Sequence, residues 1–173
     1  MSQELVSYII LGSKERLSKI KVPHNNDYEE FLLSNISHRN KLIDEVDGLV
    51  TNSNGRLIVF LPPSSLPRKK SRDLLKKIAM INLSTWGWFK YPDKGDNIRE
   101  NLRKISSRFQ NIPSIEQGIY FSKRLYFSVG GIGHFGKSPF KELSKRFLTR
   151  IEPQIPLDSL IIRTSNLDIF GKK

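Results

Sequence analysis

The sequence has 173 residues, no cysteine and a formal net charge of +12. A chain of this length buries roughly 70% of the surface of its unfolded form, so one domain can fold without metal ions or disulfides. The absence of cysteine excludes disulfides, thiolate zinc sites and cysteine nucleophiles. The three histidines, His24, His38 and His134, lie far apart in the sequence, so we predict no metal site and no cofactor.

The charge is unevenly distributed along the chain. Residues 1–63 hold 7 basic and 8 acidic side chains, whereas residues 64–173 hold 22 basic and 9 acidic ones. We therefore expect a near-neutral first part and a basic working surface in the second. A net charge of this size is evidence about partners, here polyanions, and not about the fold.

Residues 1–36 are predicted to form two strands and one helix. Residues 4–11 and 17–22 have the composition of strands and flank a turn at residues 12–15. Asn26 or Asp27 then caps a predicted helix, whose apolar positions at helical spacing are Tyr28, Phe31, Leu32 and Ile36.

Residues 41–67 are predicted to contain a helix, a strand and a connector. A helical or mixed stretch covers residues 41–46, a turn follows at 52–55, and residues 56–61 have the composition of a buried strand. The proline-rich segment 62–67 is predicted to be an extended connector, and it marks the change of charge.

The basic part is predicted to contain three helices and two strands. Apolar spacing favours helices at residues 71–81, 96–109 and 139–148; in the first of these, Leu74, Leu75, Ile78 and Ile81 form the expected buried stripe. Strands are expected at residues 119–129 and 158–164, with a glycine-rich loop after the longer one. The aromatic segment 86–91 is interpreted as a corner of the core or, alternatively, as an interfacial anchor.

Strands and helices do not alternate regularly enough for a doubly wound sheet, so the predicted fold class is α+β. We expect a single compact domain with a mixed or antiparallel sheet packed with three to four helices. The near-neutral part, 1–63, and the basic part, 64–173, would form one folded unit.

Residues 131–138 read Gly-Ile-Gly-His-Phe-Gly-Lys-Ser and fit the pattern G-x-x-x-x-G-K-[ST]. With a predicted strand before it and a helix after it, the segment resembles the loop of P-loop nucleotide hydrolases. The resemblance implies that the backbone around Gly131, Gly133 and Gly136 cradles phosphate, that Lys137 reaches the outer phosphates and that Ser138 holds magnesium.

Two other interpretations of residues 131–138 remain open. The loop could bind phosphate without hydrolysis, or it could be a plain turn with Ser138 as a helix N-cap followed by Pro139. Only 35 residues follow Ser138, and no apolar run ending in Asp occurs among them to supply a second magnesium contact. We therefore predict that the protein is not an enzyme.

Two further segments resemble known families. Residues 43–50 followed by 55–60 resemble the start of the PD-(D/E)xK nuclease core, but the second strand ends Phe60-Leu-Pro-Pro63 and lacks the carboxylate and lysine that hold the metal. Asp47 is therefore expected in a solvated turn. Residues 137–140, Lys-Ser-Pro-Phe, resemble a stretch of rhabdovirus matrix proteins.

Three rows of basic side chains are predicted on helix surfaces. They are Arg68, Lys69, Lys70, Arg72 and Lys76; Arg99, Arg103 and Lys104; and Lys137, Lys141 and Lys145. Like charges four residues apart weaken an isolated helix, so the rows favour an external anion. The alternative is that they are ordinary solvated helix faces.

Aromatic side chains accompany these charges on the predicted strand 119–129. Strand alternation would put Tyr120, Arg124 and Tyr126 on one polar face, where they could stack on unpaired bases. Equally, the tyrosines could pack under a helix.

The sequence thus predicts a non-enzymatic basic protein that binds a polyanion, most simply RNA or single-stranded nucleic acid within a ribonucleoprotein. One alternative is a viral matrix-like protein that bridges an anionic membrane and a nucleocapsid and self-associates; another is a P-loop-like nucleotide-binding protein. No run approaches 18 apolar residues and no signal peptide is recognised, so we expect an intracellular, reducing location, or a virion, and not secretion.

Overall fold

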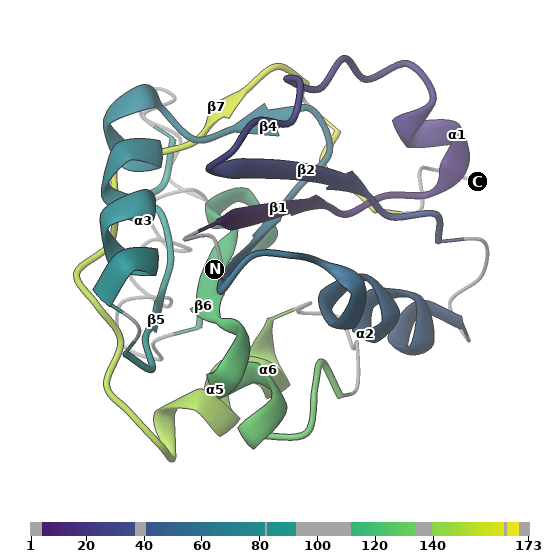
Figure 1. Ribbon diagram of the computed structural model, residues 1–173. Helices are drawn as coiled ribbons and strands as arrows, with labels where there is room; N and C mark the ends of the chain where they lie inside the picture. Colours follow the sequence, from purple (N-terminus) through teal and green to yellow (C-terminus); the bar gives the residue numbers. More distant parts are fainter. Residues whose placement is uncertain are drawn as a thin grey trace, which may run out of the picture.

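A β-sheet forms the centre of the protein in the computed structural model, which describes residues 5–36, 41–81, 83–92, 112–133, 140–164 and 166–169. Within these residues the sheet has five strands in the order β2-β1-β3-β6-β5 (Figure 1). They are β1 (Val6–Ile10), β2 (Glu29–Leu33), β3 (Leu57–Leu61), β5 (Trp86–Gly87) and β6 (Ile119–Ser122).

The sheet is mixed. β1 lies parallel to both β2 and β3, with Val6 opposite Glu29 on one side and Leu57 on the other. β6 pairs antiparallel with β3 and with β5. All residues of β1 and β3 are buried, as expected for strands covered on both faces.

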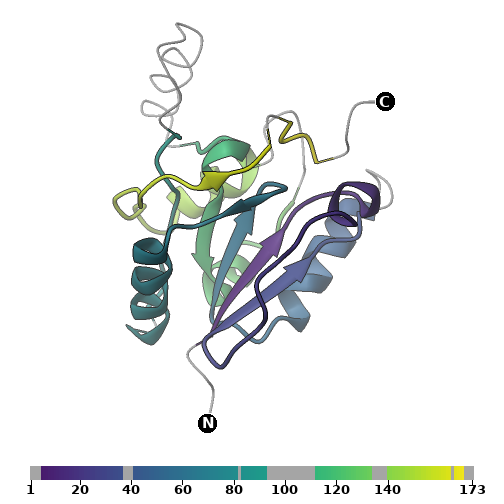
Figure 2. The ribbon, with the colours of Figure 1, turned by 90° about the horizontal axis from the view of Figure 1, so that it is seen from above.

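Helices cover both faces of the sheet (Figure 2). On one face, α3 (Lys69–Ile81) and the single turn α1 (Lys14–Leu17) pack against Val6, Tyr8 and Ile10 of β1. On the other, α2 (Leu42–Asn52), α5 (Lys123–Ser128) and α6 (Lys141–Leu148) pack against the alternate strand positions. A 3-10 helix, η2 (Ile115–Gln117), precedes β6.

Two short strands, β4 (Ser65–Leu66) and β7 (Ile161–Ile162), pair antiparallel and form a second sheet, here called the β4–β7 ribbon. Two of the six residues of the predicted connector 62–67 therefore take part in a long-range pairing. Just before it, Ser64 has a φ of 55°, a left-handed conformation that few non-glycine residues adopt, and its carbonyl accepts a hydrogen bond from the Arg163 backbone (3.0 Å).

The predicted fold class is confirmed: the protein is a single compact α+β domain with a mixed sheet. The expected strands at 4–11 and 56–61 appear as β1 and β3, and the expected helices at 41–46, 71–81 and 139–148 appear as α2, α3 and α6. The aromatic segment is a corner of the core, because Trp86 and Phe89 are fully buried. The predicted helix 96–109 lies outside the described residues.

Four local predictions are wrong in whole or in part. The helix expected after Asn26 is the strand β2, and the strand expected at 17–22 is the end of α1 followed by irregular backbone. The strand expected at 119–129 stops at Ser122 and continues as α5. In α3 the buried positions are Ser71, Leu75 and Ala79, which leaves Leu74 and Ile81 exposed.

Candidate anion-binding surface

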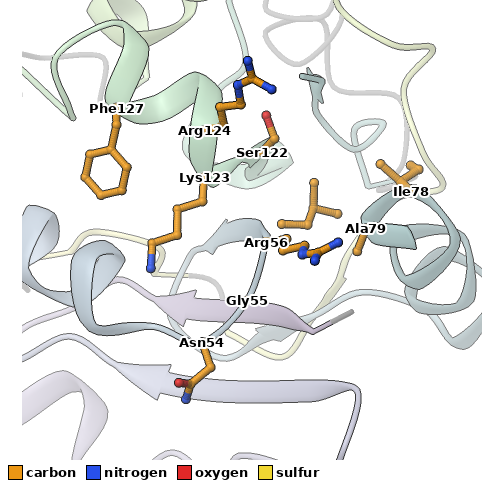
Figure 3. Close-up of a pocket in the computed structure, with 10 residues that line it drawn as sticks. Asn54, Gly55, Arg56, Ile78, Ala79, Ser122, Lys123, Arg124 and Phe127 are labelled. Carbon is orange, nitrogen blue, oxygen red and sulfur yellow. The ribbon is translucent and has the colours of Figure 1, made fainter. Parts of the chain in front are cut away.

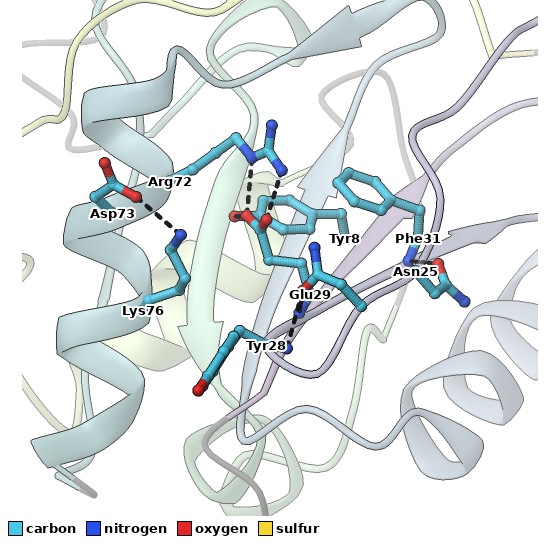
Figure 4. Close-up of polar contacts among 9 residues, drawn as sticks. Tyr8, Asn25, Tyr28, Glu29, Phe31, Arg72, Asp73 and Lys76 are labelled. Atoms are coloured by element: carbon cyan, nitrogen blue, oxygen red, sulfur yellow. Dashed lines mark hydrogen bonds and ion pairs between the residues drawn. The ribbon is translucent and has the colours of Figure 1, made fainter.

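Arg72 is bound within the protein, although the sequence predicts it in a row of anion-binding cations. It reaches from α3 to the buried carboxylate of Glu29 at the start of β2, with Nε and one Nη 2.8 and 2.5 Å from the two carboxylate oxygens (Figure 4). The Tyr8 hydroxyl donates to the same carboxylate (3.2 Å), and the guanidinium lies 5.6 Å from the centre of the Phe31 ring. A guanidinium bound along one edge by a carboxylate and packed with one face toward an aromatic ring has little left to offer an external anion.

Burial and the ion pair between Arg72 and Glu29 shift the pKa values of Glu29 and of the neighbouring Tyr8. Burial alone would raise the pKa of Glu29, but the hydrogen bonds and charge of Arg72 outweigh it and hold the pKa below its ordinary value. Burial, together with the neighbouring carboxylate, raises the pKa of Tyr8. Glu29 is therefore ionised at neutral pH and needs Arg72 as its counter-charge.

Two of the predicted lysines are held only by exposed ion pairs. Lys76 lies 2.8 Å from Asp73 on α3, and Lys145 lies 4.0 Å from Glu142 on α6. Such surface pairs contribute about 0–1 kcal/mol, so either lysine could exchange its partner for a phosphate at little cost.

The predicted stacking face with Tyr120 and Tyr126 does not exist, because both side chains are fully buried. β6 ends at Ser122, whose hydroxyl caps α5 by accepting from the Leu125 N–H (3.4 Å), so the two-residue alternation stops there. Tyr120 packs edge-on against Phe89, and Tyr126 stacks on Phe121 with ring centres 5.1 Å apart. Arg124 alone of the three is exposed.

The glycine-rich loop is held by contacts within the protein. Gly131 and Gly133 have φ angles of 78° and 67°. The Gly131 N–H donates to the Tyr126 carbonyl (3.1 Å), and the Ile132 N–H donates to the Asp47 carboxylate (3.0 Å). Asp47 also accepts the hydroxyl of Tyr126, so this carboxylate lies on α2 and anchors the loop instead of standing in a solvated turn.

These contacts do not favour the P-loop interpretation. A helix, α5, precedes the loop where the pattern needs a strand, and two of the described N–H groups that would cradle phosphate already have acceptors. Arg146 of α6 holds the loop from the other side by donating to the carbonyls of Val129 (2.6 Å) and Ile132 (2.7 Å). Gly136, Lys137 and Ser138 lie outside the described residues.

The remaining predicted cations are divided between the two faces of the sheet. Arg68, Lys69 and Lys70 are exposed where the β4–β7 ribbon leads into α3. Lys141 and Lys145 are exposed on α6, across the sheet from α3. Arg99, Arg103 and Lys104 lie outside the described residues. Of these rows, the sequence correctly predicts the exposure of Arg68, Lys69, Lys70, Lys141 and Lys145. It does not show that the two groups face opposite ways.

A pocket of about 460 Å³ opens beside the ribbon, at the carboxyl end of β1. Lys19 and Lys21, from the segment after α1, and Arg163, directly after β7, line it together with Ser64. All three cations are exposed, and none has a side-chain partner among the described residues. No acidic residue lines this pocket.

Sequence reasoning missed Lys19, Lys21 and Arg163. Their only local signal is that each lies next to apolar residues, as in Lys19-Ile-Lys21-Val22, which equally describes an ordinary strand. We call the six cations around the ribbon the ribbon surface: Lys19, Lys21, Arg68, Lys69, Lys70 and Arg163.

Within the described part of the chain, no group of acidic or histidine side chains is arranged to hold a metal ion, and no helix is long and apolar enough to cross a membrane. Comparisons with protein-family models, with curated proteins and with solved structures find no match to this chain.

Proposed function

We propose that the protein binds single-stranded nucleic acid, RNA in the first instance, through the ribbon surface. The observation that carries this proposal is the gathering of six exposed cations from three separate segments around one short β-ribbon, beside a pocket that no acidic side chain lines. Cations brought together in this way repel one another, and an external polyanion relieves the repulsion.

The spacing of the charges suits a polyanion better than a single phosphate. Arg163 lies level with Ser64 at one end of the ribbon, and Arg68 follows β4 at the other, where its side chain donates to the Ser159 carbonyl (3.3 Å). Four residues of extended chain separate these ends, or about 13 Å. Successive phosphates of one strand can contact both ends, whereas a small anion can contact only one.

The apolar part of the ribbon surface favours a single strand over a duplex. Ile161 of β7 is 41% exposed on the ribbon, and the partly buried Ile20 lines the adjoining pocket. Unstacked bases can cover such apolar groups, but the bases of a duplex lie inside the helix.

The membrane-bridging alternative loses its expected anchor, because Trp86 and Trp88 are buried in the core. Binding to anionic vesicles is therefore measured beside binding to nucleic acid in the test below.

The test is a salt titration of binding to a fluorescent oligouridine of about 12 nucleotides, within the usual site sizes of single-strand binding proteins. We expect affinity to fall steeply with salt. The triple variant K19A/K21A/R163A should bind more weakly, with a salt slope smaller by about 2, because each phosphate contact to a single strand contributes about 0.7.

The matched control is K41A/K141A/K145A, which removes the same charge from α6 and the start of α2, across the sheet from α3. It should leave the slope nearly unchanged. Absent or salt-independent binding of oligouridine by the unaltered protein would refute the proposal. Binding to phosphatidylserine vesicles at least as tight as binding to oligouridine would replace it with a membrane-associated function.

A further inference from the structure

A second pocket, of about 370 Å³, opens at the far end of α3 from the ribbon surface (Figure 3). Its walls come from three parts of the chain: the turn between α2 and β3 with Asn54 and Arg56, the last turns of α3 with Ile78, and α5 with Lys123, Arg124 and Phe127. This volume is in the range of small-ligand sites.

One wall of the pocket offers an aromatic ring to the solvent. In the six-residue helix α5, Leu125 and Tyr126 face the core, so Phe127 must point outward, and its side chain is 47% exposed. Ile78 and Ala79 of α3 extend this apolar surface across the pocket. A half-exposed phenylalanine on the rim of a pocket can stack on a flat ligand.

Basic side chains surround the apolar wall. The ammonium of Lys123 donates to the carbonyls of Thr51 (2.9 Å) and Ser53 (2.7 Å) at the end of α2, and its partial burial lowers its pKa. The next residue, Arg124, is exposed and has no side-chain partner among the described residues. Arg56 lies between α5 and α3 in Figure 3, and no acidic residue lines the pocket.

Hydrogen bonds to Glu30 fix the turn that forms one wall of the pocket. The side-chain amide of Asn54 donates to Glu30 (2.8 Å), and its backbone N–H donates to the same carboxylate (3.0 Å). The Asn54 side chain is thereby directed toward Glu30 of β2 and away from Phe127 and Arg124 (Figure 3), so it holds this wall of the pocket in place.

We propose that this pocket holds one unpaired nucleobase of the bound strand, an inference that rests on the proposed function. Phe127 would stack on the base, and Arg124 would contact the adjoining phosphate. An aromatic ring beside guanidinium groups is the usual platform for unpaired bases.

The position of α3 makes the pocket reachable from the ribbon surface. The helix begins at the ribbon with Lys69 and Lys70, and eight residues later Ile78 lines the pocket, a rise of about 12 Å. Lys77 is exposed on the helix between the two. One strand can therefore follow α3 from the ribbon surface to the pocket.

The test compares two substitutions in the same oligouridine titration. Phe127→Ala should weaken binding about tenfold with an unchanged salt slope, because it removes a stacked base and no charge. Arg124→Ala should reduce the slope by about 0.7, because it removes one phosphate contact. Phe127→Trp should retain binding, and its indole fluorescence should be quenched by oligouridine.

The matched control is Met80→Ala on α3, another large exposed side chain that does not line the pocket, which should bind as the unaltered protein does. Thermal unfolding of each variant checks that the fold is kept. If Phe127→Ala and Arg124→Ala bind oligouridine normally while K19A/K21A/R163A does not, the base pocket is wrong and the proposed function stands. If the unaltered protein does not bind oligouridine, the proposed function fails and this inference fails with it.

Discussion

At the scale of single residues, the pair of Glu29 and Arg72 links the edge strand β2 to α3. Glu29 is nearly inaccessible to solvent, and Arg72 supplies both its counter-charge and its two shortest hydrogen bonds. Arg72→Ala should therefore lower the free energy of unfolding by about 3 kcal/mol, the lower end of the range for a broken buried pair because Arg72 is partly exposed. Urea denaturation measures this change.

The double variant E29M/R72M is the control for that prediction. It removes both charges together and replaces them with apolar side chains, which in comparable pairs costs little or nothing. Stability should therefore return toward that of the unaltered protein. A double variant as unstable as Arg72→Ala would mean that packing of the arginine, and not an uncompensated carboxylate, causes the loss.

The same pair predicts a dependence of stability on pH. Because the pKa of Glu29 is lower in the folded protein than the ordinary value of about 4.3, its contribution is fully present above that pH. The contribution disappears as the pH falls through the lowered folded pKa. Urea titrations at a series of pH values should show that E29M/R72M loses less stability below about pH 4.3 than the unaltered protein does. Parallel curves for the two proteins would contradict the assignment.

At the scale of elements, the strand β2 shows where sequence patterns become ambiguous. The side chain of Asn26 accepts the N–H groups of Tyr28 and Glu29, both at 2.9 Å, which is an Asx turn and uses the same residue type as a helix cap. Phe31 and Leu32 also fit helical spacing, but in the structure they pack on opposite faces of the sheet. The parallel pairing with β1, which is a long-range contact, decides that this segment forms a strand and not a helix.

In the elements that were predicted correctly, the pattern of apolar residues fits either a strand or a helix, but not both. β3 is a short, fully apolar run and β1 is apolar except for Ser7, and α2 and α6 have apolar residues on one side only. The boundary between β6 and α5 was missed because its signal is a single hydroxyl, that of Ser122, inside a segment whose polar and apolar residues alternate as in a strand.

Two glycines in different elements give opposite predictions for the same substitution. A Cβ added to Gly131 would lie 2.8 Å from the Asp47 carboxylate oxygens, and the residue has a φ of 78°; Gly131→Ala should therefore destabilise the protein by about 1–3 kcal/mol. Gly48, inside α2, has nothing within 4 Å of such a Cβ. Gly48→Ala should stabilise the protein by about 0.5–1 kcal/mol, the usual helical preference for alanine.

Thermal and urea denaturation of the two glycine variants measure the expected loss of stability for Gly131→Ala and the expected gain for Gly48→Ala. If Gly131→Ala is neutral, the Asp47 contact does not fix the loop, and the loop is free to take another conformation around a phosphate. That result would revive the phosphate-binding interpretation of residues 131–138.

At the scale of the whole molecule, the fold decides which charges act together. Arg68, Lys69 and Lys70 form a run that the sequence displays directly, but Arg163 joins them only because β7 pairs with β4, about a hundred residues earlier. The same sheet separates Lys141 and Lys145 from α3. The amount of positive charge was therefore predictable from the sequence, whereas its division between two faces was not.

This division predicts a one-sided footprint. With oligouridine bound, Lys19, Lys21, Lys69, Lys70 and Lys77 should become protected from an amine-reactive label, while Lys41, Lys141 and Lys145 should react as in the free protein. At physiological ionic strength electrostatic effects fade within about 8 Å, less than the roughly 10 Å between a sheet and the layer packed on it, so the far face should not sense the strand. Peptide mass spectrometry of labelled protein, with and without oligouridine, measures this. Equal protection on both faces would mean that the protein binds by net charge alone, and protection confined to α6 would move the binding surface to the opposite side of the sheet.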